Sequence, residues 1–141
     1  MINDALTLEI FEALMAQDTI NPPGNEMRGA LCLKEIFDRE GIPCEVQDLG
    51  HNRANFIACF GEKTLEYSGH LDTVPCVGDW KHTAIGTTEE GDLIYGRGAC
   101  DMKGGVAAMC SAAIALYRDK TPLNGKIRLT FVADEEDANL G

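Results

Sequence analysis

The sequence is poor in basic residues and contains no long apolar run. Only 12 of its 141 residues are Lys or Arg, against 23 Asp or Glu, and the formal net charge is −11. A chain with this balance and no local basic patch is a poor partner for nucleic acid or for an anionic membrane. No apolar run approaches the roughly 20 residues of a membrane-spanning helix. We therefore expect no nucleic-acid partner and no membrane partner.

The sequence also lacks a secretory signal pattern and a C-x-x-C pair. Its acidic opening, Asn3-Asp4, stands where a signal peptide carries positive charge followed by an apolar stretch. Reduced thiols in the cytoplasm are the simplest interpretation of scattered cysteines without such a signal. The six cysteines are Cys32, Cys44, Cys59, Cys76, Cys100 and Cys110.

The composition that remains is that of a folded domain. Hydrophobic residues make up 45% and charged residues 25%, and no composition shift or internal repeat divides the chain. We therefore treat residues 1–141 as one unit with one core.

Apolar residues at helical spacing predict two helices, at 4–17 and 26–40, separated by the helix-breaking segment Asn21-Pro22-Pro23-Gly24-Asn25. Strand patterns follow at 42–48, 55–60, 64–69, 92–95 and 126–132, and a small-residue helix is predicted at 102–117. Strand 55–60 is apolar without alternation, which suits a strand covered on both faces. These patterns predict an α/β fold, a layered sheet with helices on both faces. The expected inward residues are Leu6, Ile10, Phe11, Leu14 and Met15 in the first helix, and Leu31, Leu33, Ile36 and Phe37 in the second.

Three segments with possible metal ligands occur at predicted strand ends or helix starts. They are Ser68–Pro75, Gly96–Gly105 and Ala133–Asp137. Functional groups of α/β sheets gather beyond the carboxyl ends of strands. A His, a central Asp and a pair of Glu residues suit a hydrolytic metal site better than any other single chemistry.

Each segment alone has a simpler interpretation. His70 could be a structural histidine supported by Asp72, Asp101 could cap the following helix, and Glu135-Glu136 could belong to a solvated acidic turn. Their occurrence together, each at a strand end or helix start, favours the metal site. Glu135 and Glu136 could then divide two tasks, metal ligation and general base catalysis.

A phosphate-binding turn is the main rival for the glycine-rich segment. Gly96-Arg97-Gly98-Ala99-Cys100-Asp101 fails the G-x-G-x-x-G pattern because Asp101 stands where glycine is required. It also fails the P-loop pattern, and a carboxylate at its centre would repel phosphate. Nucleotide binding is therefore not expected.

The three segments together resemble the successive metal-site motifs of the M20 metallopeptidase family, which includes acetylornithine deacetylase, succinyl-diaminopimelate desuccinylase, aminoacylases and carboxypeptidases. The segment from Asn21 to Glu26 is similar to a loop frequent in its deacylase branch. The resemblance runs from about Leu6 to Glu136. It implies a zinc-hydrolase catalytic domain of the phosphorylase/hydrolase-like fold.

The resemblance also implies a role for each site residue. His70 would bind one zinc ion, Asp101 would bridge two, and Glu136 would bind the second. Glu135 would act as the general base toward a metal-activated water, and Asp72 would support His70. Co²⁺ or Mn²⁺ could replace Zn²⁺ at such a site. The peptide bond between Asp101 and Met102 would be cis.

Members of this family are much longer than 141 residues. We therefore expect the chain to be the N-terminal portion of the catalytic domain, truncated before the remaining metal ligands and the dimerisation domain, and inactive or nearly so by itself. The parent would be a homodimeric amidohydrolase acting on small N-acyl amino acids or peptides, of the deacylase or desuccinylase type. A dipeptidase or carboxypeptidase of the same family is the alternative. A non-catalytic binding or regulatory module on the same fold is an alternative of a different class.

Three residues near the motifs keep two interpretations. Trp80 and His82 either line a substrate cleft or serve packing. Arg97, between two glycines, is expected to be a structural ion-pair partner rather than a clamp for substrate.

Overall fold

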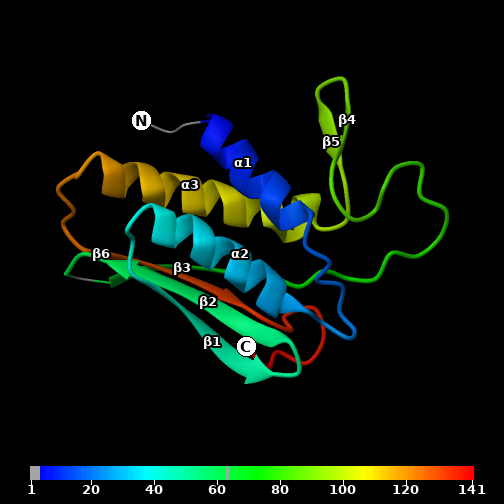
Figure 1. Ribbon diagram of the computed structural model, residues 1–141, viewed down its shortest axis with the longest axis horizontal. Coiled ribbons are helices and arrows are strands. Elements are labelled where there is room, and N and C mark those ends of the chain that lie inside the picture. Colours follow the sequence, from blue (N-terminus) through cyan, green and yellow to red (C-terminus); the bar gives the residue numbers. More distant parts are fainter. Residues whose placement is uncertain (1–3, 63) are drawn as a thin grey trace.

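The computed structural model describes residues 4–62 and 64–141, which form a mixed sheet with helices packed against it (Figure 1). This arrangement confirms the prediction of a layered α/β fold. In chain order the elements are α1 (Asp4–Met15), α2 (Glu26–Arg39), β1 (Cys44–Gly50), β2 (Arg53–Phe60), β3 (Thr64–His70), β4 (Thr88–Glu90), β5 (Leu93–Tyr95), the π-type turn η1 (Ala99–Lys103), α3 (Gly104–Arg118) and β6 (Lys126–Val132).

The main sheet has the strand order β1-β2-β6-β3. β1 pairs antiparallel with β2, and β2 pairs antiparallel with β6. β3 and β6 are parallel neighbours, although the long connection through β4, β5 and α3 separates them in sequence. Parallel pairing requires such a crossover, and it brings the carboxyl ends of β3 and β6 to the same edge of the sheet.

The described helices lie on one face of the sheet. α2 and α3 contact the strands, and α1 packs on both of these helices (Figure 1). Alternation along β6 explains this placement, because Ile127, Leu129 and Phe131 are buried under the helices. On the opposite face, the hydroxyl of Thr130 donates to Glu66 at 2.6 Å. The expected second layer of helices has no counterpart in the part of the chain that the structure describes.

The core forms between the helical layer and the sheet. The ring of Phe56 on β2 meets Phe37 of α2 edge-on, with ring centroids 5.1 Å apart, and stacks on Phe131 of β6 at 6.1 Å. All five apolar residues predicted to face inward from α1 are buried, as are Leu33, Ile36 and Phe37 of α2. Leu31 was predicted to be buried as well, but it is 52% exposed. The inward stripe of α2 passes through Ala30 and Gly29 instead, on the side that faces the sheet and α1.

Two further features differ from the sequence-based expectation. The pair β4 and β5 forms a two-stranded hairpin that stands away from the main sheet, and its first strand had no sequence signal (Figure 1). The helical stretch Ala99–Arg118 is apolar and long enough, by length and composition, to cross a membrane, whereas no such run was expected. In this fold its C-terminal part, α3, packs between α1 and the strands, as a core helix does.

Candidate metal centre

The parallel pairing of β3 with β6 assembles two of the predicted motifs. His70, the last residue of β3, is in register with Val132, the last residue of β6, and the pairing continues when Leu71 N–H donates to Val132 O at 2.9 Å. The residues that follow each strand therefore emerge side by side. This places His70 and Asp72 next to the turn that carries Glu135 and Glu136.

The third motif approaches from the helical layer through η1. Within this turn Asp101 has φ −126° and ψ 98°, and the bond between Asp101 and Met102 is cis, as the family resemblance implied. α3 begins only at Gly104, so Asp101 does not cap that helix. The buried Lys103 anchors the turn to the C-terminal end of α1, because its Nζ donates to Leu14 O in the last turn of the helix at 3.0 Å and to Gln17 O just after it at 2.8 Å.

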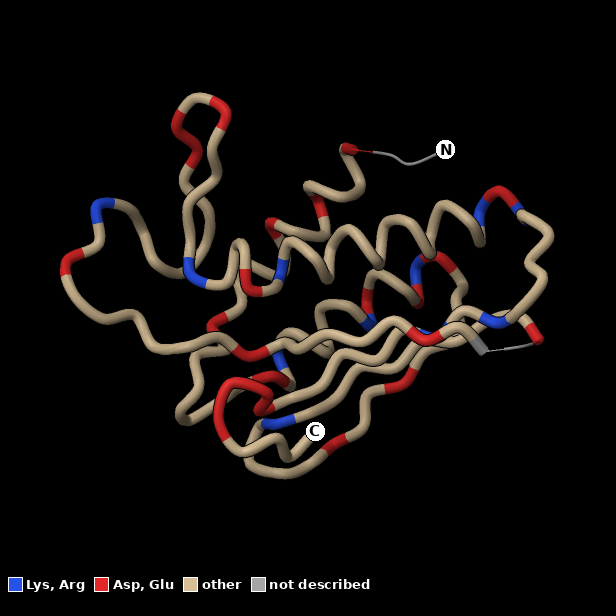
Figure 2. The backbone as a smooth tube through the Cα atoms, turned by 180° about the vertical axis from the view of Figure 1, so that it is seen from behind, with Lys and Arg blue, Asp and Glu red and all other residues tan. Residues whose placement is uncertain are grey.

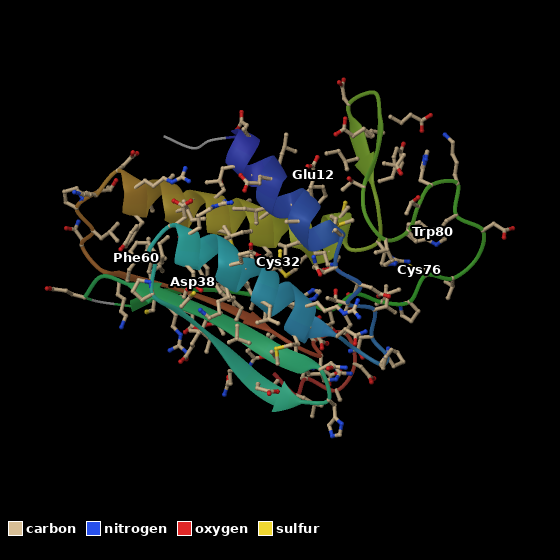
Figure 3. The ribbon with its side chains drawn as sticks, in the orientation of Figure 1. Glu12, Cys32, Asp38, Phe60, Cys76 and Trp80 are labelled. Atoms are coloured by element: carbon tan, nitrogen blue, oxygen red, sulfur yellow. The ribbon has the colours of Figure 1, made fainter. Side chains whose placement is uncertain are left out.

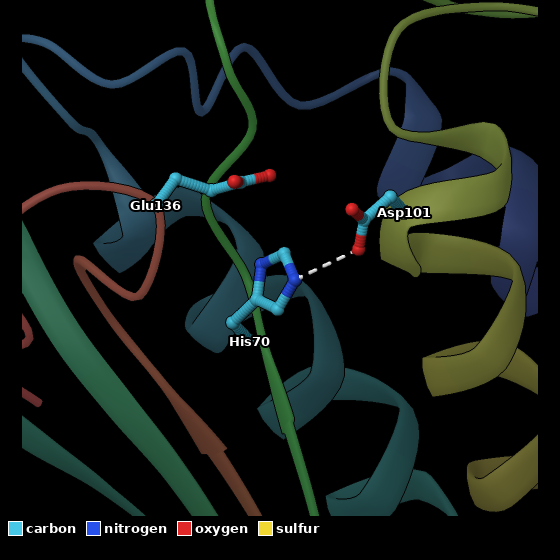
Figure 4. A group of neighbouring side chains, drawn as sticks. All are labelled: His70, Asp101 and Glu136. Atoms are coloured by element: carbon cyan, nitrogen blue, oxygen red, sulfur yellow. Dashed lines mark hydrogen bonds and ion pairs between the residues drawn. The ribbon is translucent and has the colours of Figure 1, made fainter.

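His70, Asp101 and Glu136 form one cluster (Figure 4). Each offers one ligand atom, and these atoms all lie within 4.8 Å of one another. His70 Nε2 is 3.1 Å from Asp101 Oδ1 and 3.7 Å from Glu135 Oε2. The imidazole is buried, whereas the side chain of Asp101 is 76% exposed and that of Glu135 is 49% exposed. The histidine of the cluster is therefore held inside the protein, whereas the carboxylates of Asp101 and Glu135 are accessible to solvent.

The cluster carries an excess of negative charge. Burial raises the pKa of Glu136, and the neighbouring carboxylates of Asp101 and Asp72 raise it further, although His70 opposes them. Burial disfavours the charged imidazole, yet contacts with Asp72 and Asp101 raise the pKa of His70 to about 9. Figure 2 shows consecutive acidic residues in the turn after β6. The imidazole of His70 and the carboxylates of Asp101 and Glu136 fit a divalent cation, which would offset the negative charge of the cluster.

Asp72 joins the histidine to the acidic turn. Its side chain is fully buried and accepts hydrogen bonds from the backbone N–H groups of Glu135 at 3.2 Å and Glu136 at 3.1 Å. His70 Nδ1 lies 3.0 Å from Asp72 O and 3.5 Å from Asp72 Oδ1, so Nε2 is the nitrogen that faces the cluster. Burial acts against the ionised carboxylate, but hydrogen bonds from His70, Asn21 and the turn lower the pKa of Asp72 to about 2. Asp72 therefore stays ionised and holds both sides of the site together.

Behind Asp72 lies a buried polar network that no local sequence pattern indicated. Asn21 Nδ2 donates to Asp72 Oδ2 at 2.9 Å and to Asp134 Oδ1 at 2.7 Å. Arg53 Nη1 contacts Asp134 Oδ1 at 2.7 Å and Glu26 Oε1 at 2.9 Å, and its Nη2 donates to Asn21 Oδ1 at 2.8 Å. These residues come from the loop before α2, from α2, from β2 and from the turn after β6. Only the similarity of the loop from Asn21 to Glu26 hinted at them, because charged residues this far apart in sequence give no local pattern.

Asp101 and Glu136 of the cluster line a pocket of about 620 Å³. The other lining residues come from the long loop after β3, where Trp80 is located (Figure 3), and from residues 94–100. Trp80 and His82 both line the pocket, which favours the first of their two interpretations. Cys100 also lines it and is exposed.

The structure thus brings together His70, Asp72, Asp101, Glu135 and Glu136. Glu135 and Glu136 lie on a turn rather than on the strand itself, and the backbone N–H groups of both point to Asp72. Their individual roles in ligation and catalysis stay predictions.

Comparison with known proteins identifies relatives for this arrangement. The model of the peptidase family M20/M25/M40 matches residues 67–141, which include all three motifs. A probable succinyl-diaminopimelate desuccinylase from Staphylococcus aureus is 37% identical over 121 residues, covering 83% of this chain and 30% of the relative. A succinyl-diaminopimelate desuccinylase from Orientia tsutsugamushi is 31% identical and covers 96% of this chain and 36% of its own. The chain therefore spans about a third of the length of these relatives.

Solved structures agree on the fold. An M20 family metallo-carboxypeptidase from Sulfolobus solfataricus superimposes with a TM-score of 0.81 at 29% identity, over 92% of this chain and 31% of that structure. Human carnosine dipeptidase 1 superimposes with a TM-score of 0.77 over 89% of this chain and 31% of that structure. Its 22% identity supports the fold alone.

Proposed function

The chain belongs to the peptidase family M20/M25/M40, and from that premise we propose that it is the N-terminal part of a metal-dependent amidohydrolase. The proposed substrate is a small N-acyl amino acid, cleaved at its amide bond in a deacylase or desuccinylase reaction. The observation that carries the proposal is the cluster of His70, Asp101 and Glu136, whose ligand atoms lie within 4.8 Å of one another beside a pocket.

A divalent metal is implied by membership of this family, and the donor set suits it. One imidazole nitrogen and two carboxylates are ligands that Zn²⁺, Co²⁺ and Mn²⁺ all accept, and Zn²⁺ is the metal we propose. His70 would bind one ion, Asp101 would bridge two, and Glu136 would bind the second, with further ligands supplied by the rest of the protein. Such ions polarise an amide carbonyl and lower the pKa of a nearby water molecule.

Glu135 is the residue we assign to proton transfer. Its carboxylate lies 3.7 Å from His70 Nε2 and is half-exposed, so it can reach both a water molecule and a substrate beside the cluster. It would take a proton from the attacking water and return it to the leaving amine. Asp72 would keep this geometry, because it holds the backbone of Glu135 and the imidazole of His70 at the same time.

Two considerations favour a desuccinylase type over the alternatives. The curated relatives reported above are desuccinylases, whereas the dipeptidase similarity is one of fold at 22% identity. A non-catalytic module would need no Glu135 beside the ligand cluster. We further propose that the whole protein is a cytoplasmic homodimer and that residues 1–141 alone have little or no activity.

Zinc binding by this chain tests the site directly. After dialysis against trace zinc, the wild type should retain metal and Asp101→Ala should lose it. Asp79→Ala, which changes another carboxylate of the same pocket, is the matched control and should leave zinc binding unchanged. Retention of zinc by Asp101→Ala would remove Asp101 from the site.

The role of Glu135 as general base is tested in the complete protein. Glu135→Gln preserves the shape of the side chain but removes its basicity, so it should bind zinc normally and lose nearly all turnover. Turnover at the wild-type rate would exclude Glu135 as the base.

A further inference from the structure

The pocket beside the metal cluster is lined by two side chains of the Lys or Arg type in the described part of the chain, Lys81 and Arg97. They differ in how their charges are balanced. Lys81 Nζ contacts both carboxylate oxygens of Glu90, at 2.9 and 2.8 Å. The same carboxylate lies 3.2 Å from His82 Nε2. The charge of Lys81 is therefore already neutralised by the β4–β5 hairpin.

Arg97 has no such partner. Its guanidinium carbon lies 4.9 Å from the ring centroid of Trp80, and its Nη2 donates to Pro75 O at 3.2 Å. Its Nε is buried without a hydrogen-bond partner, and no carboxylate of residues 4–62 or 64–141 lies within ion-pair distance. The expectation that Arg97 is a structural ion-pair partner is therefore wrong. In a chain of net charge −11, this guanidinium faces an indole and a carbonyl instead of an acid.

The backbone holds Arg97 rigidly in this position. A Cβ atom on Gly96 would lie 2.3 Å from Gly86 O, and one on Gly98 would lie 2.5 Å from Thr73 Cγ2. Gly98 also has a φ of +86°, which favours glycine. Arg97 N–H donates to Ala84 O at 2.7 Å. Because both neighbours are packed this closely, the segment can present the guanidinium with little loss of freedom on binding.

We propose that Arg97 binds a carboxylate of the substrate and so selects anionic N-acyl amino acids over uncharged amides. A guanidinium offers parallel N–H donors that match a carboxylate, and its flat face can stack on Trp80 while these donors are in use. Asp79, Asp101 and Glu136 line the same pocket and would repel an anion. An unpaired cation in the same pocket is what allows an anionic ligand to bind. The inference rests on the proposed function, because it concerns the substrate of that site.

The experiment uses Trp80, which is the single tryptophan of the sequence. Its fluorescence reports on the stacked guanidinium directly and requires no turnover. The zinc-supplemented chain is titrated with succinate and with butyrate, which have four carbons each and differ by one carboxylate. Either ligand can place one carboxylate on zinc, and only succinate has a second carboxylate for Arg97. We expect succinate to bind about tenfold to a hundredfold more tightly, the range of a hydrogen bond to a charged group.

Arg97→Gln should reduce this preference to less than about threefold while butyrate binding stays the same, and Arg97→Lys should restore part of it. Lys81→Gln is the matched control, since it removes the cation that Glu90 already neutralises, and should keep the preference. Circular dichroism verifies that each variant is folded. An unchanged preference in Arg97→Gln overturns the proposal, as does a wild type that binds both ligands equally or binds neither.

The proposed function can fail independently of this result. Loss of the succinate preference in Arg97→Gln supports the carboxylate subsite even if Glu135→Gln retains turnover. Conversely, zinc binding that depends on Asp101, together with an unchanged succinate preference in Arg97→Gln, supports the metal centre and refutes the subsite.

Discussion

Replacing Arg53 by alanine should destabilise the protein strongly, although Arg53 is not one of the candidate metal ligands. Its guanidinium joins Glu26 and Asp134, whose side chains are 0% and 1% exposed. Each of these carboxylates also has one buried oxygen, Glu26 Oε2 and Asp134 Oδ2, without a hydrogen-bond partner among the described residues. Without Arg53, two buried negative charges would face one another, with Asp72 nearby.

Breaking a buried ion pair by removing one partner costs about 3–5 kcal/mol, because the remaining charge is left uncompensated. This is a large share of the about 5–15 kcal/mol by which domains are stable. The variant can escape part of the cost by protonating a carboxylate. Burial already raises the pKa of Glu26 despite the opposing charge of Arg53, and removal of Arg53 should raise it further. A raised carboxyl pKa favours the folded state at low pH, so the loss should shrink as the pH falls from 7 toward 5.

Urea unfolding followed by circular dichroism measures the loss at each pH. Arg39→Ala is the matched control. Arg39 is itself exposed, its short ion pair at 2.7 Å is with the exposed Glu9, and its contact with Glu40 is longer, at 3.7 Å. Exposed ion pairs contribute little to stability. Arg53→Lys should lie between the wild type and Arg53→Ala, since one ammonium group cannot serve all of the acceptors. A loss in Arg53→Ala no larger than that of Arg39→Ala, or one that is independent of pH, would refute this account of the network.

The remaining predictions concern packing and charge elsewhere. Leu33→Ala should cost about 2–5 kcal/mol in urea unfolding whereas Leu31→Ala should cost little, because Leu33 is fully buried and Leu31 is 52% exposed; equal losses would contradict the orientation of α2. Gly98→Ala should lower the melting temperature, since its Cβ would meet Thr73 at 2.5 Å, and an unchanged melting temperature would argue against this packing. Burial lowers the pKa of Lys103 from 10.5 to about 8. Between these two pH values the unfolded state therefore binds more protons than the folded state. As the pH rises through this range, the free energy of unfolding of the wild type should rise by about 3 kcal/mol relative to that of Lys103→Met. Parallel stability curves for the two proteins would exclude this effect.

Local patterns predicted most of the elements. The strand at 126–132 has the predicted bounds, and the inward residues of α1 are the predicted ones, because both depend on periodicity within a single segment. The meeting of His70, Asp101 and Glu136 was also predictable. Each lies in a motif at a strand end or before a helix, and parallel strands bring such ends to one edge of a sheet.

The predictions that were wrong concern features that depend on contacts between segments distant in sequence. The position of Leu31 depends on which side of α2 the neighbouring elements cover, and the position of the helical layer depends on which sheet face is covered. Arg97, between two glycines, was expected to be an ion-pair partner. In the folded chain, Glu90 pairs with Lys81 instead, and Trp80 stacks on Arg97. None of these pairings leaves a trace in the local sequence.

The sequence by itself determined the α/β class, most element positions and the identity of the candidate ligands, since periodicity, turn residues and motif spacing act within short segments. Only the tertiary structure decided how those ligands are held. Asp72 became the link between His70 and the acidic turn because β3 and β6 pair in parallel. Arg53 became the partner of Glu26 and Asp134 because three segments that are distant in sequence meet there. Burial and charge pairing depend on these distant contacts, so they exist only once the chain has folded.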